Sequence, residues 1–162
     1  MAKTTAARPD ALEILEREHR RFEALLAQGE ATTDRARKGR RRLLDRLVSE
    51  LAAHEVMEEQ VLYPALLSYA HTRETLAEGL HEHDSAESIA NELRALSTDD
   101  AQWEARFMVL KRVLQQHMDH EEKHLFPVAR AAFSREELRD LADRMLGLKS
   151  LRRSPPRRQR ED

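Results

Sequence analysis

A motif that occurs twice limits the possible folds of this chain more than any other feature of its sequence. Residues 54–64 and residues 117–127 both read His-x3-Glu-Glu-x3-aromatic-Pro, 63 positions apart. A second echo lies before each copy, where Glu18-His19 is repeated 64 positions later as Glu82-His83. A chain made of two alike halves predicts two alike helix pairs, whose equivalent residues converge on one point.

Apolar residues recur at helical spacing in four long stretches, which predicts four amphipathic helices. Capping-box patterns at Asp10/Glu13 and Ser134/Glu137 mark the starts of the first helix and of a fifth, shorter one. The expected helices run from residue 10 to 29, from the basic stretch 35–42 to the proline at 64, from 72 to 96, from the break at 97–100 to about 128, and from 134 to about 148. Short connections favour antiparallel neighbours, so the predicted fold class is all-α: an up-down-up-down four-helix bundle with a short C-terminal helix.

The composition agrees with this fold and excludes several classes of protein. Charged residues make up 36% of the chain and aromatic residues 4%, as in long solvated helices. The chain contains no cysteine, so disulfides, thiolate zinc sites and thiol catalysis are excluded. No stretch approaches the ~18 apolar residues of a membrane span, and residues 1–10 lack a secretory signal, so we expect a cytoplasmic protein without membrane contact.

The charge distribution divides the chain into two parts. Residues 1–149 form the expected bundle domain, and residues 150–162 are basic, contain Pro155 and Pro156 and lack apolar periodicity, which predicts a disordered tail. The net charge of the whole chain is −2, so nucleic acid is not an expected partner.

The repeated motif places ionisable side chains on the apolar faces of the helices. A His and a Glu four positions apart lie on one helix face, and here leucines flank them on that face. A buried carboxylate without a partner costs several kcal/mol, and a pair of divalent cations would remove that cost. A single His on an apolar stripe is usually a hydrogen-bonded core residue. Inward histidines on four helices, two of them followed by Glu one turn later, point instead to metal ligands suited to iron.

The order His, His-x3-Glu, His, His-x3-Glu resembles the hemerythrin-like (HHE) cation-binding family over about residues 11–132. The resemblance implies a four-helix bundle with two non-heme irons, bridged by an oxo or hydroxo group and by carboxylates. Carried over by position, Glu58 and Glu121 would bridge the irons and the histidines would be terminal. The implied ligands are His19, His54, Glu58, His83, His117 and Glu121.

The sequence departs from the oxygen-carrying hemerythrins, which place two histidines one turn apart on the third helix. Here Gly79 and Glu87 occupy the positions four residues from His83. The carboxylate of the fourth helix is Glu121, four residues after its His, where those proteins have an Asp five residues after it. These differences argue against simple reversible oxygen carriage. Further candidates for the metal shell are Glu55 and His120, with Glu87 and Glu23 behind them.

The expected function is therefore binding of, or reaction with, a small oxidant: oxygen, peroxide or nitric oxide. One alternative is an iron- or oxygen-sensing or iron-storage module without turnover. Another is a ferritin-like site built from Glu-x-x-His pairs, for which the candidates are Glu16/His19, Glu78/His81 and Glu121/His124. A metal-free structural bundle would leave two buried carboxylates unexplained. The sequence leaves the metal identity, the electron donor and the oligomeric state open.

Overall fold

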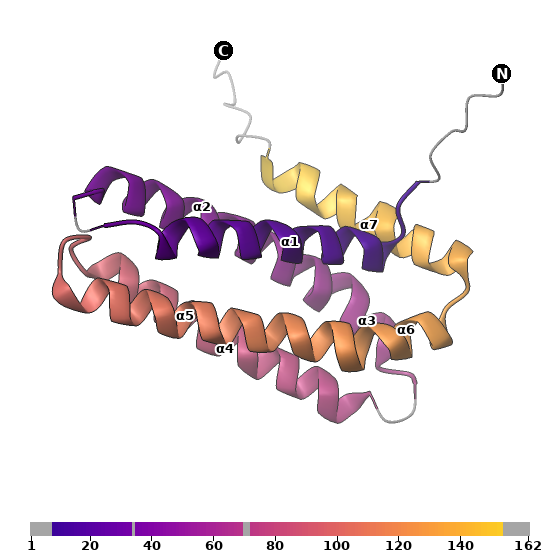
Figure 1. The fold of residues 1–162 in the computed structure, drawn as a ribbon. Coiled ribbons are helices and arrows are strands. Elements are labelled where there is room, and N and C mark those ends of the chain that lie inside the picture. Colours follow the sequence, from indigo (N-terminus) through magenta and orange to yellow (C-terminus); the bar gives the residue numbers. More distant parts are fainter. Residues whose placement is uncertain (1–7, 34, 70–71, 154–162) are drawn as a thin grey trace, which may run out of the picture.

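The structure is a computed structural model that describes residues 8–33, 35–69 and 72–153, with side chains as far as position 150. The four long helices lie antiparallel in a bundle (Figure 1). α1 packs against α2 and α5, and α4 packs against the same two helices, so the four form a closed ring. The elements in order are α1 (Ala11–Glu30), α2 (Arg37–Met57), η1 (Glu58–Leu62), α3 (Tyr63–Leu66), α4 (Arg73–Ala95), α5 (Ala101–His120), η2 (Glu121–Leu125), α6 (Phe126–Ala132) and α7 (Arg135–Arg153). The predicted all-α bundle is confirmed.

Helices α1 and α7 begin where their capping residues predict. The side chain of Asp10 accepts a hydrogen bond from the backbone N–H of Glu13, and the Glu13 side chain accepts one from the Asp10 N–H. The same reciprocal pair links Ser134 and Glu137 at the start of α7. Each pair satisfies two backbone donors that a helix start leaves free, which fixes the first turn of both helices.

Each copy of the repeated motif contains a π-helical segment, which sequence periodicity did not predict. η1 and η2 begin at Glu58 and Glu121, and the N–H groups of Tyr63 and Phe126 donate to the carbonyl oxygens of those glutamates, five residues back. The proline that follows each segment has no N–H to donate, which weakens the regular α-helical ladder there. π-segments inside α-helices are frequent at functional sites. The structure therefore has a local widening of the helix at each motif glutamate.

The buried core consists of two hydrophobic clusters with a polar layer between them. One cluster lies toward α7 and includes Leu15 and Leu125, and the other lies toward the opposite end and includes Phe22 and Leu114. His19 lies in the sequence between Leu15 and Phe22, and His117 lies between Leu114 and Leu125. The motif residues are thus held between two packed apolar regions.

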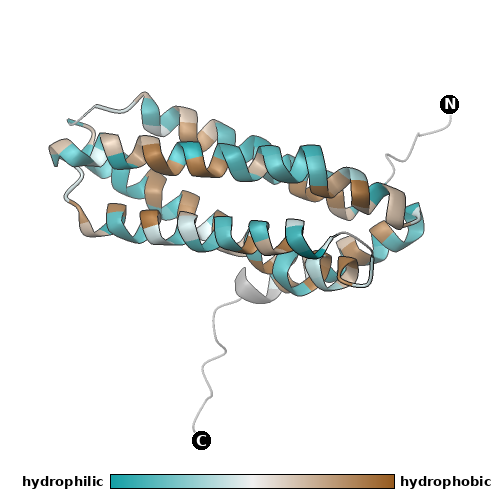
Figure 2. Cartoon of the chain, turned by 90° about the horizontal axis from the view of Figure 1, so that it is seen from below, coloured by the Kyte–Doolittle hydropathy of each residue, from teal (hydrophilic) through white to brown (hydrophobic). Residues whose placement is uncertain are grey.

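Hydrophobic and hydrophilic residues alternate along the helices, as expected of helices with one buried face (Figure 2). None of the helices in the described ranges combines the length and the apolar character that a membrane span requires.

The C-terminal helix α7 is longer than predicted. It extends to Arg153 instead of ending near residue 148, and it packs on α1, α2 and η1. Leu138, Leu141 and Met145 of α7 are buried in the neighbouring hydrophobic cluster. The predicted tail therefore begins with a few helical residues, and its remainder, residues 154–162, lies outside the described part of the chain.

Candidate metal centre

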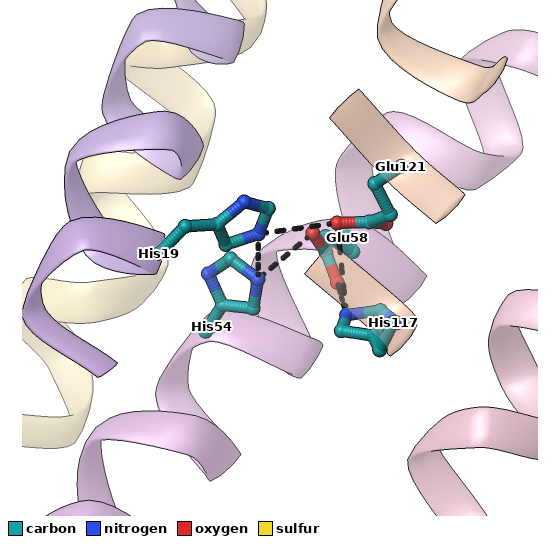
Figure 3. Close-up of side chains that lie close together, drawn as sticks. All are labelled: His19, His54, Glu58, His117 and Glu121. Atoms are coloured by element: carbon teal, nitrogen blue, oxygen red, sulfur yellow. Dashed lines mark hydrogen bonds and ion pairs between the residues drawn. The ribbon is translucent and has the colours of Figure 1, made fainter. Parts of the chain in front are cut away.

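Five of the six candidate ligands from the sequence meet in the polar layer of the bundle. Each offers one nitrogen or oxygen atom, and these atoms all lie within 4.8 Å of one another. All five residues are buried, and they come from α1, α2, η1, α5 and η2 (Figure 3). They are His19, His54, Glu58, His117 and Glu121.

His83, the sixth candidate, lies beside this cluster. Its Nε2 is 3.2 Å from Oε2 of Glu58, and its ring centroid is 4.8 Å from that of His117. It is 4% exposed. The structure therefore places all six candidates in one layer, with His83 at the α4 side of it.

The two motif glutamates lie between pairs of histidines. Oε1 of Glu58 is 3.0 Å from Nε2 of His54, and its Oε2 faces His83 from the other side. Oε2 of Glu121 lies 3.3 Å from Nε2 of His19 and 3.6 Å from Nε2 of His117. Both carboxylates thus connect the histidines of the first half of the chain with those of the second.

Each of the four histidines is oriented by a second carboxylate, which contacts its Nδ1 atom. Because an ionised carboxylate only accepts hydrogen bonds, each Nδ1 must carry the proton, and each neutral ring then has its lone pair on Nε2. That is the arrangement typical of metal-bound histidines. The four pairs are His19 with Glu122 at 2.8 Å, His54 with Glu18 at 3.1 Å, His83 with Glu59 at 2.8 Å, and His117 with Glu82 at 3.2 Å.

Sequence reasoning did not assign a role to these four carboxylates, although the repeat contained the signal. Glu18 and Glu82 are the acidic residues directly before His19 and His83, and Glu59 and Glu122 are the second glutamates of the two motifs. Equivalent positions therefore make equivalent contacts in both halves. Glutamates that recur in both halves without being candidate ligands thus indicated the carboxylates that contact the Nδ1 atoms.

Several buried polar atoms at the centre have no hydrogen-bond partner. They include both carboxylate oxygens of Glu58, Oε2 of Glu121, and Nε2 of His83 and His117. The Nε2 atoms of His19 and His54 lie 3.2 Å apart, a distance at which they can share one proton in a hydrogen bond or both face one cation. Leaving such atoms buried and unpaired is costly. The donor set therefore fits cations at this place.

The pKa values of Glu58 and of several histidines are shifted because buried carboxylates lie next to imidazoles. Burial opposes ionisation of Glu58, yet His54, His83 and His117 hold the pKa of its carboxyl well below the ordinary range. Burial lowers the pKa of a histidine, but close contact with the charged carboxylate of Glu58 outweighs burial and raises the pKa of His83 to about 9. The pKa values of His54 and His117 are raised for the same reason, chiefly by Glu58 and Glu121 respectively. Protons stabilise these carboxylates when no metal is bound, so metal binding must displace protons.

One aromatic residue at the centre distinguishes its two halves. The hydroxyl of Tyr63 donates a hydrogen bond of 3.0 Å to Oε1 of Glu121, and the ring stacks on His83. Phe126, the equivalent residue of the second motif, stacks on His19 in the same way but has no hydroxyl. A Cβ at Gly79 would lie 2.5 Å from the Tyr63 hydroxyl oxygen, so glycine at that position makes room for this contact.

The remaining candidates from the sequence lie outside this cluster. Glu55 is partly buried, and burial raises the pKa of its carboxyl to about 7. Glu23 and Glu87 are exposed, and Glu23 pairs with Arg20 at 3.2 Å. His120 contacts Oε2 of Glu82 at 3.2 Å through its Nδ1 and is part of the surrounding network.

The ferritin-like alternative is not supported by the structure. It requires His81 and His124 to point into the bundle, but both are exposed, and the side chain of Glu78 is 57% exposed. The two halves also differ at His124, which is exposed, whereas its equivalent Val61 is buried because α7 packs on η1 and does not cover η2 in this way.

Comparisons with known proteins agree with this architecture. A family model described as Hemerythrin HHE cation binding domain matches residues 10–129. An uncharacterized hemerythrin-like protein of Schizosaccharomyces pombe is 30% identical over 95 residues; the match covers 57% of this chain and 47% of that protein, so the chain spans about half the length of this relative. The crystal structure of a hemerythrin HHE cation binding domain-containing protein from Mycobacterium kansasii has a TM-score of 0.78 at 23% identity, covering 89% of this chain and 87% of the other. At that identity the likeness establishes the fold.

Proposed function

Because this chain belongs to the hemerythrin HHE cation-binding domain family, we propose that its buried His/Glu cluster holds two non-heme irons that bind or react with a small oxidant. The observation that carries the proposal is the arrangement of the four histidines, whose Nδ1 atoms contact carboxylates while their Nε2 atoms face the centre. Iron accepts imidazole nitrogen and carboxylate oxygen as ligands.

Two metal positions are supported by the pairing of the histidines around the glutamates. His19 and His54 lie together on one side, with 3.2 Å between their Nε2 atoms, and His83 and His117 lie together on the other. His19 and His54 would hold one metal, His83 and His117 would hold the other, and Glu58 and Glu121 would serve both. Each of these two glutamates lies near both pairs, as a bridging carboxylate must.

The protein's own residues would then shape the reaction. When bound, ferrous irons with open positions supply electrons and a binding place for oxygen, peroxide or nitric oxide. The two hydrophobic clusters limit access to small molecules. The Tyr63 hydroxyl holds one oxygen of Glu121, which leaves its other oxygen, Oε2, facing His19 and His117.

The direct test is reconstitution of the metal-free protein with ferrous iron without air, followed by separate additions of oxygen, hydrogen peroxide and nitric oxide. The proposal expects a change in the near-ultraviolet and visible absorbance with at least one of them. A reconstituted protein that contains iron but responds to none of the three would contradict the oxidant-binding function.

A sensing role is the second candidate, and one contact favours it. Lys149 of α7 forms an ion pair with Glu18, whose other oxygen accepts a hydrogen bond from Nδ1 of His54. A change at His54 on metal binding would therefore reach α7 through one carboxylate. Metal binding to the folded state stabilises it without turnover. Hydrogen exchange of α7 that differs between the metal-free and iron-loaded protein would support this role, and identical exchange would contradict it.

A further inference from the structure

We propose that cations reach the centre through the cavity between α2 and α4, and that Glu55 and the acidic side chains beside it draw them in. This inference rests on the proposed metal-binding function and adds the route by which the metal is loaded. It concerns residues that lie outside the ligand set.

The cavity connects the surface with one of the proposed ligands. Its volume is about 420 Å³, and His83 forms part of its wall. The four other cavities identified in the described part of the chain are lined by none of the six proposed ligands. The opening between α2 and α4 is therefore the one among these five whose wall includes a proposed ligand.

The walls of this cavity carry four carboxyl groups and one guanidinium. Its charged residues are Glu55, Glu59, Asp84, Glu87 and Arg94. The single guanidinium is shared, because its Nε lies 3.8 Å from a carboxylate oxygen of Asp45. A cleft lined by one sign of charge between low-dielectric walls raises the local concentration of the opposite ion and its rate of association. The cavity is thus suited to a divalent cation.

The repeat loses its symmetry at this cavity. A groove between α1 and η2 contains the repeat equivalents of Asp84 and Glu59, which are Arg20 and Glu122; its lining is three glutamates and two arginines, and Arg20 forms an ion pair with Glu122. The residue that corresponds to Arg20 on the α4 side is Asp84, 64 positions later. An arginine that would repel a cation on one side is thus replaced by a carboxylate on the other.

Glu55 also adds an acidic group that the other half of the repeat lacks. The equivalent position 63 residues later is Met118, which is buried in the apolar core. Oε1 of Glu55 is buried and has no hydrogen-bond partner. Since Glu55 and His83 line the same cavity, this oxygen can hold a cation before it reaches the imidazole.

The test measures how fast the full-length, metal-free protein takes up ferrous iron without air, by rapid mixing and a chelator quench. Glu87→Lys changes the charge at the cavity, and Glu23→Lys makes the same change at the repeat-equivalent, exposed position on α1. At low ionic strength we expect Glu87→Lys to slow the initial uptake by about threefold to tenfold, with Glu23→Lys at the wild-type rate. Both should reach the wild-type iron content, and added salt should reduce the difference.

Glu55→Gln keeps the shape of the side chain and removes its charge, and it should also slow uptake without changing the final iron content. Wild-type rates in both Glu87→Lys and Glu55→Gln, or equal slowing by Glu23→Lys, would overturn the access route while the metal site stands. Failure of the wild-type protein to take up iron at all would instead contradict the proposed function.

Discussion

Tyr63 and Glu121 join the two halves of the repeat across the bundle. The Tyr63 hydroxyl donates a hydrogen bond to one oxygen of Glu121, and the equivalent residue of the other half, Phe126, makes no such bond to Glu58. The two motif glutamates therefore have different surroundings, although they occupy equivalent positions in the repeated motif. The Glu121 carboxylate accepts a hydrogen bond from a phenol, whereas the Glu58 carboxylate faces imidazoles at both of its oxygens.

Tyr63→Phe removes this hydrogen bond and makes the two halves alike. A hydrogen bond to a charged group contributes about 1.5–3 kcal/mol, so the metal-free variant should lose roughly that much stability in denaturant unfolding. Tyr69→Phe makes the same chemical change outside the centre, next to Phe133, and should have a smaller effect. Equal stabilities of Tyr63→Phe and wild type would show that the bond contributes nothing.

Gly79→Ala tests the space that this contact needs. The added Cβ would lie 2.5 Å from the Tyr63 hydroxyl oxygen, so the ring must shift. Overpacking of this kind costs about 1–3 kcal/mol. Gly147→Ala is the matched control, because a Cβ there has no atom within 4 Å, and replacing a helical glycine should stabilise by about 0.5–1 kcal/mol. Opposite shifts in melting temperature are expected, and a stabilised Gly79→Ala would be inconsistent with the geometry.

Glu82→Gln tests the carboxylates that orient the histidines. The neutral amide accepts a weaker hydrogen bond from Nδ1 of His117 than the charged carboxylate does, so the imidazole is less firmly oriented and less basic. Loss of such partners typically weakens metal binding by about 10–100-fold. Iron affinity measured by competition with a chelator should fall by that factor, whereas Glu74→Gln, an exposed change on the same helix, should bind as wild type. Unchanged affinity in Glu82→Gln would remove this role.

Much of this centre could be predicted from the sequence, because helix geometry links the spacing of residues along the chain to their positions in the bundle. A His and a Glu four positions apart must share a helix face, and the leucines on that face, such as Leu47, Leu51 and Leu114, marked it as buried. The helices and the convergence of the proposed ligands could therefore be predicted. The π-segments at Glu58 and Glu121 could not be predicted. The apolar residues around them still recur at the spacing of an α-helix, so the wider turn leaves no mark on the sequence pattern.

Contacts between helices were also beyond the sequence pattern. Lys149 reaches Glu18 only because α7 folds back onto α1 and α2, and nothing in the local spacing of either residue indicates that packing. The exposure of His124 has the same origin, since it depends on which half of the repeat α7 covers. Internal symmetry predicts equivalent residues, and the fifth helix then makes their environments different.

The metal-free protein should lose stability as the pH rises from about 6.5 to 9. The folded-state pKa of His83 is raised to about 9 from 6.5, so its contribution is present below pH 6.5 and is lost as the pH rises through 9. Glu55, with its pKa raised to about 7 from 4.5, acts in the same direction at lower pH: its contribution is lost as the pH rises through 7. The melting temperature of chelator-treated protein should decline from about pH 6 through about pH 7.5 to about pH 9. A rise over this range would contradict the charge balance described above.

The proposed ligands can be separated from a nearby surface histidine by substitution. His54→Ala, His117→Ala and Glu58→Ala should each lose most of the bound iron, and Glu58→Ala should remain helical because removal of a buried carboxylate also removes its desolvation cost. His81→Ala, on the exposed side of α4, should keep its iron. Iron loss in His81→Ala with retention in His54→Ala would mean that the ligand set is wrong.

The number of irons bound per chain tests the central claim most directly. Full-length protein is stripped of metal, reconstituted with ferrous iron without air, freed of excess iron and subjected to elemental analysis. Two histidine pairs joined by two carboxylates predict about two irons per chain, as in other two-metal sites. A value near one would contradict the dinuclear centre, and a value near zero would contradict the metal-binding function itself.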